Sequence, residues 1–284
     1  MALFGAMQTA ISGLNAQASA VSNISGNIAN SQTSGYKRLD TEFEDLAIQS
    51  GARSPITGGV IASARATTQV QGSISQSENP LALAISGRGF LSVARPTSES
   101  STGTLTFDSQ VAYTRAGDFT LNRGGYLVNP SGYVLRGWIA SAGAIDETSA
   151  LNPIVVSRAD GGGSPASPFS FVSFAENGDI EANYQNGSRQ VIARVPVITF
   201  ANSDALERLD GQAFAATRDS GAATRVNPNS AGAGRFVIGA VEGSNVDIAS
   251  EFSKLIVAQR AYTGNTRVIT TADQMLQDAI NIVR

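Results

Sequence analysis

The sequence predicts an α+β fold in which N- and C-terminal α-helices pair as a coiled-coil-like domain and a central segment forms an antiparallel β domain. Three observations support this class. An uncharged N-terminal segment has the apolar spacing of a helix, and the C-terminal segment repeats that spacing over a longer stretch. Between them, short alternating runs are separated by hairpin signals. The chain therefore has two helical ends and one β body.

The N-terminal helix is expected to present one apolar row and to end in a cluster of turn-forming residues. No charged side chain occurs from Met1 to Tyr36. The apolar residues recur mostly in steps of three and four, the spacing of a coiled-coil seam; they are Met7, Ile11, Leu14, Ala18, Val21 and Ile28. Gly35 closes the turn cluster and is the expected helix end, because glycine adopts the left-handed conformation that stops helices.

The C-terminal helix is expected to be apolar on more than one face. Its main row consists of Phe252, Leu255, Tyr262, Ile269, Leu276, Ile280 and Val283, and a second row runs beside it from Val268 to Ile282. A helix with two apolar faces needs more than one neighbour. Ser244 and Asp247 have the spacing of a capping box, which predicts that the helix begins there.

Two interpretations of these ends remain open. In one, the helices pair and cap an ordinary domain. In the other, they drive assembly, because an uncharged segment does not repel its own copies. Helices of roughly 36 Å and 57 Å would also extend beyond a core of this size. The second interpretation predicts that other subunits cover the helices.

The remaining boundaries follow from turn signals. Residues 1–36 and 244–284 form the predicted helical assembly domain, 37–70 an extended connector without a clear period, and 71–243 the antiparallel β domain. Asn177-Gly178 and Asn186-Gly187, each between alternating runs, are the strongest hairpin signals. A Gly-rich stretch suggests that 139–168 is a variable loop or small insertion.

Composition excludes most kinds of catalytic and metal-binding site. The chain has 284 residues, no cysteine and no histidine, which removes disulfides, thiol nucleophiles and the usual zinc ligands. Its net charge of -3 does not favour nucleic acid, and no segment has the length and apolarity of a membrane span. A charged leader followed by an apolar run is also missing, so a cleaved signal peptide is not expected. We predict no catalytic, cofactor or metal site, and no enzyme activity.

Several segments resemble one known family, the flagellar rod and hook family of axial proteins. They are Asn27 to Arg38 (NIANSQTSGYKR), Phe43 to Leu46 (FEDL), Leu83 to Phe90 (LAISGRGF), Tyr113 to Phe119 (YTRAGDF) and Ser244 to Ala261 (SNVDIASEFSKLIVAQRA). The resemblance implies a hollow tube built from many copies. The helices would form its inner domain around an export channel, and the β domain would lie outside.

Within the family the chain looks most like the hook protein, a flexible joint that transmits torque outside the cell. The stretch from Phe169 to Leu209 carries this likeness. The resemblance implies that its partners are further copies of itself, distal rod, hook cap and hook-filament junction proteins, and the type III export apparatus. The first alternative is the distal rod protein, which is close in length. A second is a secreted β-domain enzyme or adhesin with oligomerising terminal helices.

Overall fold

The computed structural model describes residues 2–48, 56–99, 105–141, 144–156, 169–230 and 232–282. The chain divides into two compact units. The first comprises Met1–Ser31, Arg38–Thr67 and Val246–Arg284, and the second comprises Gln32–Lys37 and Thr68–Asn245. Terminal helices thus flank a central antiparallel β domain, and the predicted α+β class is confirmed.

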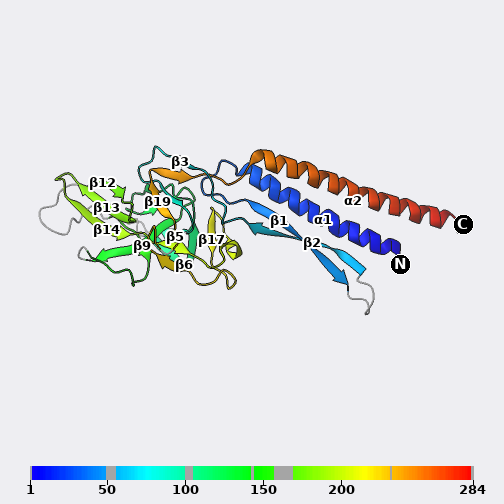
Figure 1. Cartoon of the computed structure of the whole chain (residues 1–284), viewed down its shortest axis with the longest axis horizontal. Coiled ribbons are helices and arrows are strands. Elements are labelled where there is room, and N and C mark those ends of the chain that lie inside the picture. Colours follow the sequence, from blue (N-terminus) through cyan, green and yellow to red (C-terminus); the bar gives the residue numbers. More distant parts are fainter. Residues whose placement is uncertain are drawn as a thin grey trace. The chain divides into compact units, whose positions relative to one another are not determined.

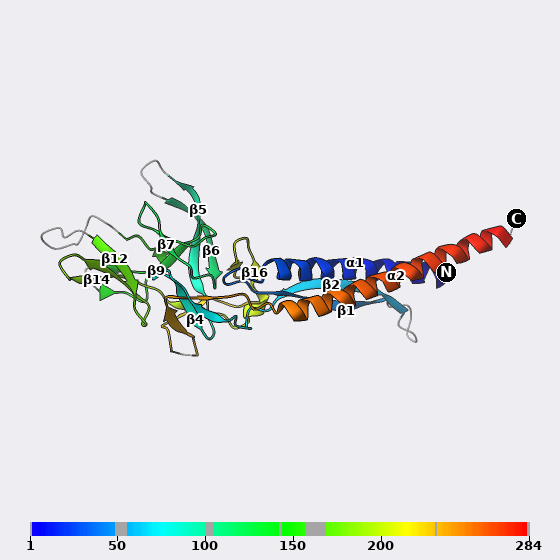
Figure 2. The same ribbon diagram turned by 90° about the horizontal axis from the view of Figure 1, so that it is seen from above.

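The first unit consists of two long helices and one hairpin. Helix α1 spans Ala2–Ala29 and α2 spans Ile248–Ile282. Strand β1, Leu39–Ile48, pairs antiparallel with β2, Ile56–Ala66. In Figures 1 and 2 the two helices run side by side, with the hairpin next to them.

This hairpin replaces the extended connector expected over 37–70. In its described part, Leu39 pairs with Ala66 and Leu46 with Gly59. The two strands carry exposed apolar residues, Phe43, Leu46 and Ile61, beside acidic ones. Because most of their apolar side chains are not buried, the strands lack the clear alternation from which sequence patterns are recognised.

The second unit is built on one large antiparallel sheet. The strand order is β12-β13-β14-β9-β5-β6-β17-β16. These strands span Phe169–Phe174, Asp179–Tyr184, Arg189–Arg194, Val134–Ser141, Leu91–Glu99, Leu105–Thr114, Ala213–Ala215 and Glu207–Arg208. Strands β8 (Leu127–Val128), β10 (Ala144–Ile145) and β11 (Asn152–Pro153) pair with β9, and β7 (Thr120–Leu121) pairs with β8.

Three small sheets complete this unit. They pair β15 (Val197–Thr199) with β18 (Thr224–Val226), β19 (Arg235–Ile238) with β4 (Leu83–Ser86), and β20 (Ala240–Glu242) with β3 (Ile74–Gln76). A short 3-10 helix lies at Ser203–Ala205. The core is aliphatic and aromatic, with Leu83, Phe119 and Ile180 fully buried.

The predicted turns lie where the sequence placed them. Gly178 connects β12 to β13 and Gly187 connects β13 to β14, both with positive φ. At these positions glycine avoids the steric cost that a side chain would incur. In the segment 139–168 the structure describes the end of β9, β10 and β11, and residues 142–143 and 157–168 lie outside the described residues.

Candidate assembly interface

The buried row of α1 contains mostly small residues. Ala10, Ala16, Ala20, Ile24 and Asn27 are buried, and Gly13 is half-buried between Ala10 and Ala16. Their steps of three and four residues keep them on one face of the helix. Small side chains on this face let a neighbouring backbone approach closely.

The row expected from the sequence lies one residue further along the helix. Its members Met7, Leu14, Val21 and Ile28 are half-buried, and Ile11 and Ala18 are exposed. One residue corresponds to a rotation of about 100° around the helix. These larger apolar side chains therefore border the buried row of α1, and their role between subunits stays a prediction.

Helix α2 has a matching buried row at heptad spacing. Glu251, Ala258 and Ala272 are buried, and Asn265 is half-buried. The residues predicted for assembly lie around it. Leu255, Ile269 and Leu276 are half-buried, Phe252, Tyr262 and Ile280 are exposed, and Val283 lies outside the described residues.

The two helices pair in antiparallel orientation with a constant register. The Asn27 Nδ2 atom donates a hydrogen bond to Glu251 Oε2 at 2.9 Å. Two heptads away on each helix, Gly13 faces Asn265 so closely that a Cβ on Gly13 would lie 2.7 Å from the amide nitrogen. Ala20 and Ala258 occupy the heptad position between these two pairs. Figure 1 shows the resulting arrangement, with the start of α1 and the end of α2 at the same end of this unit.

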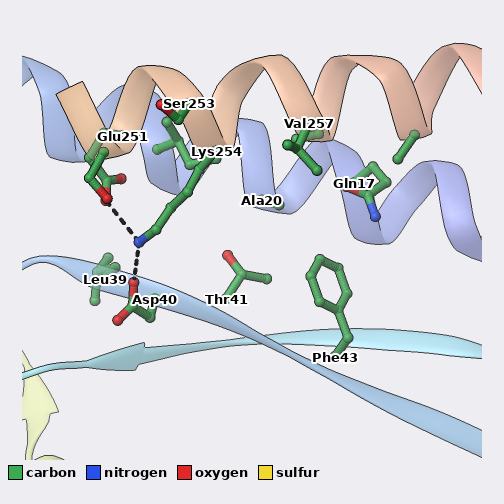
Figure 3. Close-up of a pocket in the computed structure, with 14 residues that line it drawn as sticks. Gln17, Ala20, Leu39, Asp40, Thr41, Phe43, Glu251, Ser253, Lys254 and Val257 are labelled. Atoms are coloured by element: carbon green, nitrogen blue, oxygen red, sulfur yellow. Dashed lines mark hydrogen bonds and ion pairs between the residues drawn. The ribbon is translucent and has the colours of Figure 1, made fainter. Parts of the chain in front are cut away.

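A polar cluster joins both helices to the hairpin. Asn27 accepts a hydrogen bond from the backbone nitrogen of Leu39 and donates one to its carbonyl oxygen, both at 2.9 Å. Lys254 bridges Glu251 and Asp40, with its Nζ atom 2.9 Å from an oxygen of each, as Figure 3 shows. Burial lowers the pKa of Lys254, but its bonds to the two carboxylates outweigh this effect and raise the pKa overall. This polar cluster therefore links α1, α2 and the hairpin to one another.

A largely apolar groove opens beside this cluster. It has a volume of about 670 Å³ and lies between α1, β1 and α2. Ala20 on α1, Phe43 on β1 and Val257 on α2 line it (Figure 3). Phe43 and Val257 remain exposed in the single chain.

Helix α2 keeps further large apolar side chains in contact with solvent. They occur on several faces and along its whole length: Phe252, Ile256, Val257, Tyr262, Val268, Met275 and Ile280. Exposed apolar residues in this number on one helix are available for contacts with other chains.

The helix ends differ in part from the expected caps. Asp247 directly precedes α2, and its carboxylate accepts hydrogen bonds from the backbone nitrogens of Ala249 and Ser250, so it is the N-cap. Ser244 is half-buried in the second unit. Gly35 is also in the second unit, where its positive φ and close approach to the backbone of Ala116 require glycine.

The second unit contains a buried ion cluster that sequence patterns did not reveal. The Lys37 Nζ atom lies 2.6 Å from Glu242 Oε1, and Arg115 Nη1 lies 3.0 Å from Glu242 Oε2. The side chains of Lys37 and Glu242 are 0% exposed and that of Arg115 is 4% exposed. Burial lowers the pKa of both Lys37 and Arg115, and Glu242 opposes this effect. Lys37 belongs to the NIANSQTSGYKR segment and Arg115 to the YTRAGDF segment, and these resemblances were the signals at this site.

The described part of the chain shows no cluster of acidic residues that could hold a metal ion. Neither α1 nor α2, over its described residues, has the length and apolarity needed to cross a membrane.

Comparison with family models agrees with this architecture. The model "Flagella basal body rod protein" matches residues 7–37, "Flagellar hook protein FlgE/F/G D1 domain" matches 84–181, and "Flagellar basal body rod FlgEFG protein C-terminal" matches 238–282. The matches cover α1, much of the β domain and α2.

Curated relatives extend the likeness over the whole chain. The flagellar basal-body rod protein FlgG of Caulobacter vibrioides is 34% identical, with 96% of this chain and 97% of the relative covered. FlgG of Bacillus subtilis is 30% identical over 98% of both chains. The flagellar hook protein FlgE of Brucella abortus is 26% identical over the full length of both, in an alignment of 407 residues. The chain belongs to the flagellar rod and hook family of axial structural proteins.

Proposed function

We propose that this chain is the structural subunit of a flagellar hook, in which copies assemble through their terminal helices into a hollow tube. The exposed apolar side chains along α2 carry this proposal. A helix of 35 residues with apolar side chains on several faces is stable in water when other helices cover it. Further copies of the same chain provide such helices in a polymer.

The hook assignment rests on the second half of the β domain. The stretch from Phe169 to Leu209 resembles the hook pattern of strand, Asn-Gly-Asp turn and strand, followed by VITFANSDAL. Strands β12, β13, β14 and β15 occupy this stretch. The Brucella hook protein aligns with this chain from end to end.

The distal rod is the second candidate, and a different observation favours it. FlgG relatives are 30% to 34% identical and align almost without length difference, whereas the hook alignment needs 407 positions for 284 residues. A rod subunit would form a rigid shaft within the cell envelope instead of a flexible joint outside the cell.

The proposed contacts between copies are the apolar rows bordering the buried seam. On α1 these are Met7, Ile11, Leu14, Ala18, Val21 and Ile28. On α2 they are Phe252, Leu255, Tyr262, Ile269, Leu276 and Ile280, and the proposal also includes Val283, which lies outside the described residues. Distal rod, hook cap and hook-filament junction proteins would contact the ends of the tube, and the type III export apparatus would deliver the chain without cleaving a signal peptide.

Complementation with electron microscopy tests the assignment. Restoring the chain to a strain that lacks its gene should produce curved tubes outside the cell, attached to the basal body. Straight tubes confined to the cell envelope would instead support the distal rod. Failure to form any tube would contradict both.

A further inference from the structure

We infer that two heptad positions, Asn27 with Glu251 and Gly13 with Asn265, determine the register in which α1 and α2 pair. This inference concerns the single chain, and it holds whether the polymer is hook or rod. Register matters because it decides which residues face outward along the whole length of both helices.

Small residues alone would select the register weakly. Ala20 on α1 faces the buried row of α2 that contains Ala258. Ala10 continues the buried row on α1, and Ala272 continues the one on α2, both at positions that fit a heptad repeat. Sliding one helix by one heptad, about 10 Å, would again place small residues opposite one another. Contacts of alanine with alanine therefore differ little between registers.

The Asn27–Glu251 pair supplies the discrimination that alanines lack. Glu251 is fully buried and its two oxygens accept hydrogen bonds from Asn27 and Lys254. A slide by one heptad that brings Glu251 opposite Ala20 would keep its ion pair with Lys254, which lies on the same helix, but would remove the hydrogen bond from the Asn27 amide. A buried carboxylate oxygen that loses its hydrogen-bond donor is unfavourable. A single polar pair in an apolar seam is known to specify register at some cost in stability.

Gly13 provides an independent, steric criterion. The Asn265 side chain occupies the space where a Cβ on Gly13 would be, with amide atoms 2.7 to 3.4 Å from that position. Gly5 and Gly26, elsewhere on α1, have no atom within 4 Å of the corresponding position. Asn265 therefore fits opposite a glycine, and the observed register supplies one.

Disulfide trapping measures the register directly, because the natural chain has no cysteine. The pair Ala20→Cys with Ala258→Cys reports the observed register. The pair Ala10→Cys with Ala261→Cys reports a slide of one heptad, the one that brings Glu251 opposite Ala20, since in the observed register these positions are too far apart for a disulfide. In the full-length chain, oxidation should trap the first pair and not the second.

Replacing the polar pair should loosen the register. In Asn27→Leu with Glu251→Leu, we expect the Ala10–Ala261 disulfide to appear and the Ala20–Ala258 disulfide to fall at least severalfold. Replacing the exposed pair Glu42→Gln with Arg65→Gln in the hairpin should leave both yields unchanged. If the leucine variant still traps only the Ala20–Ala258 pair, the inference is overturned for this position.

The glycine position is tested separately, so that misfolding of the leucine variant would not leave the question open. Gly13→Ala should lower the Ala20–Ala258 yield, Gly26→Ala should not, and adding Asn265→Ala to Gly13→Ala should restore it. Equal yields for the two glycine variants would refute the steric criterion.

Discussion

At the scale of single residues, the feature with the highest desolvation cost is the ion cluster of Lys37, Arg115 and Glu242. One carboxylate pairs with two cations in a site from which solvent is excluded. Backbone groups supply further hydrogen bonds: Lys37 donates to the carbonyl of Val70, and Glu242 accepts from the nitrogen of Gly72. Buried charges are tolerated only when they are paired and hydrogen-bonded in this way. The cluster thus holds Lys37, the last residue of the segment Gln32–Lys37, against the β domain within its own unit.

Removing the shared carboxylate should therefore destabilise the second unit. Glu242→Gln leaves two buried cations without a counter-charge, and breaking a buried pair typically costs about 3 to 5 kcal/mol. Urea unfolding followed by circular dichroism measures the loss. The matched control is Glu42→Gln, whose ion pair with Arg65 is about half exposed and should contribute less than about 1 kcal/mol. Similar losses in the two variants would contradict the assigned importance of the cluster.

At the scale of elements, the start of α2 depends on one side chain. The Asp247 carboxylate accepts bonds from two backbone nitrogens of the first turn, and its negative charge lies at the positive end of the helix dipole. The Lys254 contacts then connect the next turn of α2 to β1. Cap and ion cluster together fix the helix start next to the hairpin.

The cap can be tested against a carboxylate elsewhere on the same helix. Asp247→Ala should lower the stability of the helical unit by about 0.5 to 2 kcal/mol. Asp278→Ala should not lower it, because a negative charge near the C-terminal end of a helix is unfavourable. Helicity and unfolding midpoints of the two variants give the comparison, and an equal loss in both would remove the capping role.

The pH dependence of the Lys254 cluster has a defined sign. A lysine whose folded-state pKa is raised contributes stability that is fully present below its ordinary value of 10.5. This contribution disappears as the pH rises through the higher folded-state value. The stability difference between the natural chain and Lys254→Met should therefore shrink when urea unfolding is repeated at increasing alkaline pH. A difference that stays constant across this range would show that the ammonium charge is not what stabilises the cluster.

The sequence predicted elements well where local chemistry determines them. Asn177-Gly178 and Asn186-Gly187 mark real hairpins, because only glycine adopts those turn conformations without strain. The two helices and the three-and-four spacing of their apolar residues were also recognisable from the sequence. The face of α1 that packs against α2 was not, because hydrophobicity selects Leu14 and Val21, whereas close packing of two backbones selects Gly13 and Ala20. The hairpin β1–β2 was missed because its strands lack a clear alternation. Lys37 and Arg115, the partners of Glu242, lie far from it in the sequence, and no local pattern reveals such pairs.

At the scale of the whole molecule, exposed apolar residues on α2 connect the fold of one chain to its assembly. Met275 is 60% exposed in the single chain, so an added charge there costs little before assembly. Leu276, the next residue, is half-buried. Substitutions at these two neighbouring positions can therefore distinguish contacts within the chain from contacts between copies.

Met275→Asp should leave the unfolding midpoint of the free subunit nearly unchanged while blocking the polymer. A carboxylate covered by a neighbouring copy would be desolvated without a partner, which costs several kcal/mol in every subunit of the tube. Leu276→Asp should also prevent polymerisation, but with some loss of stability in the free subunit, because this side chain is already partly covered. Asn186→Asp, in an exposed turn of the second unit, is the control and should polymerise normally. Sedimentation and electron microscopy of the purified variants, together with motility of complemented cells, measure these outcomes. Normal tubes from Met275→Asp would show that this face of α2 stays exposed in the polymer, and the contacts between copies would then have to lie on another face of the helices.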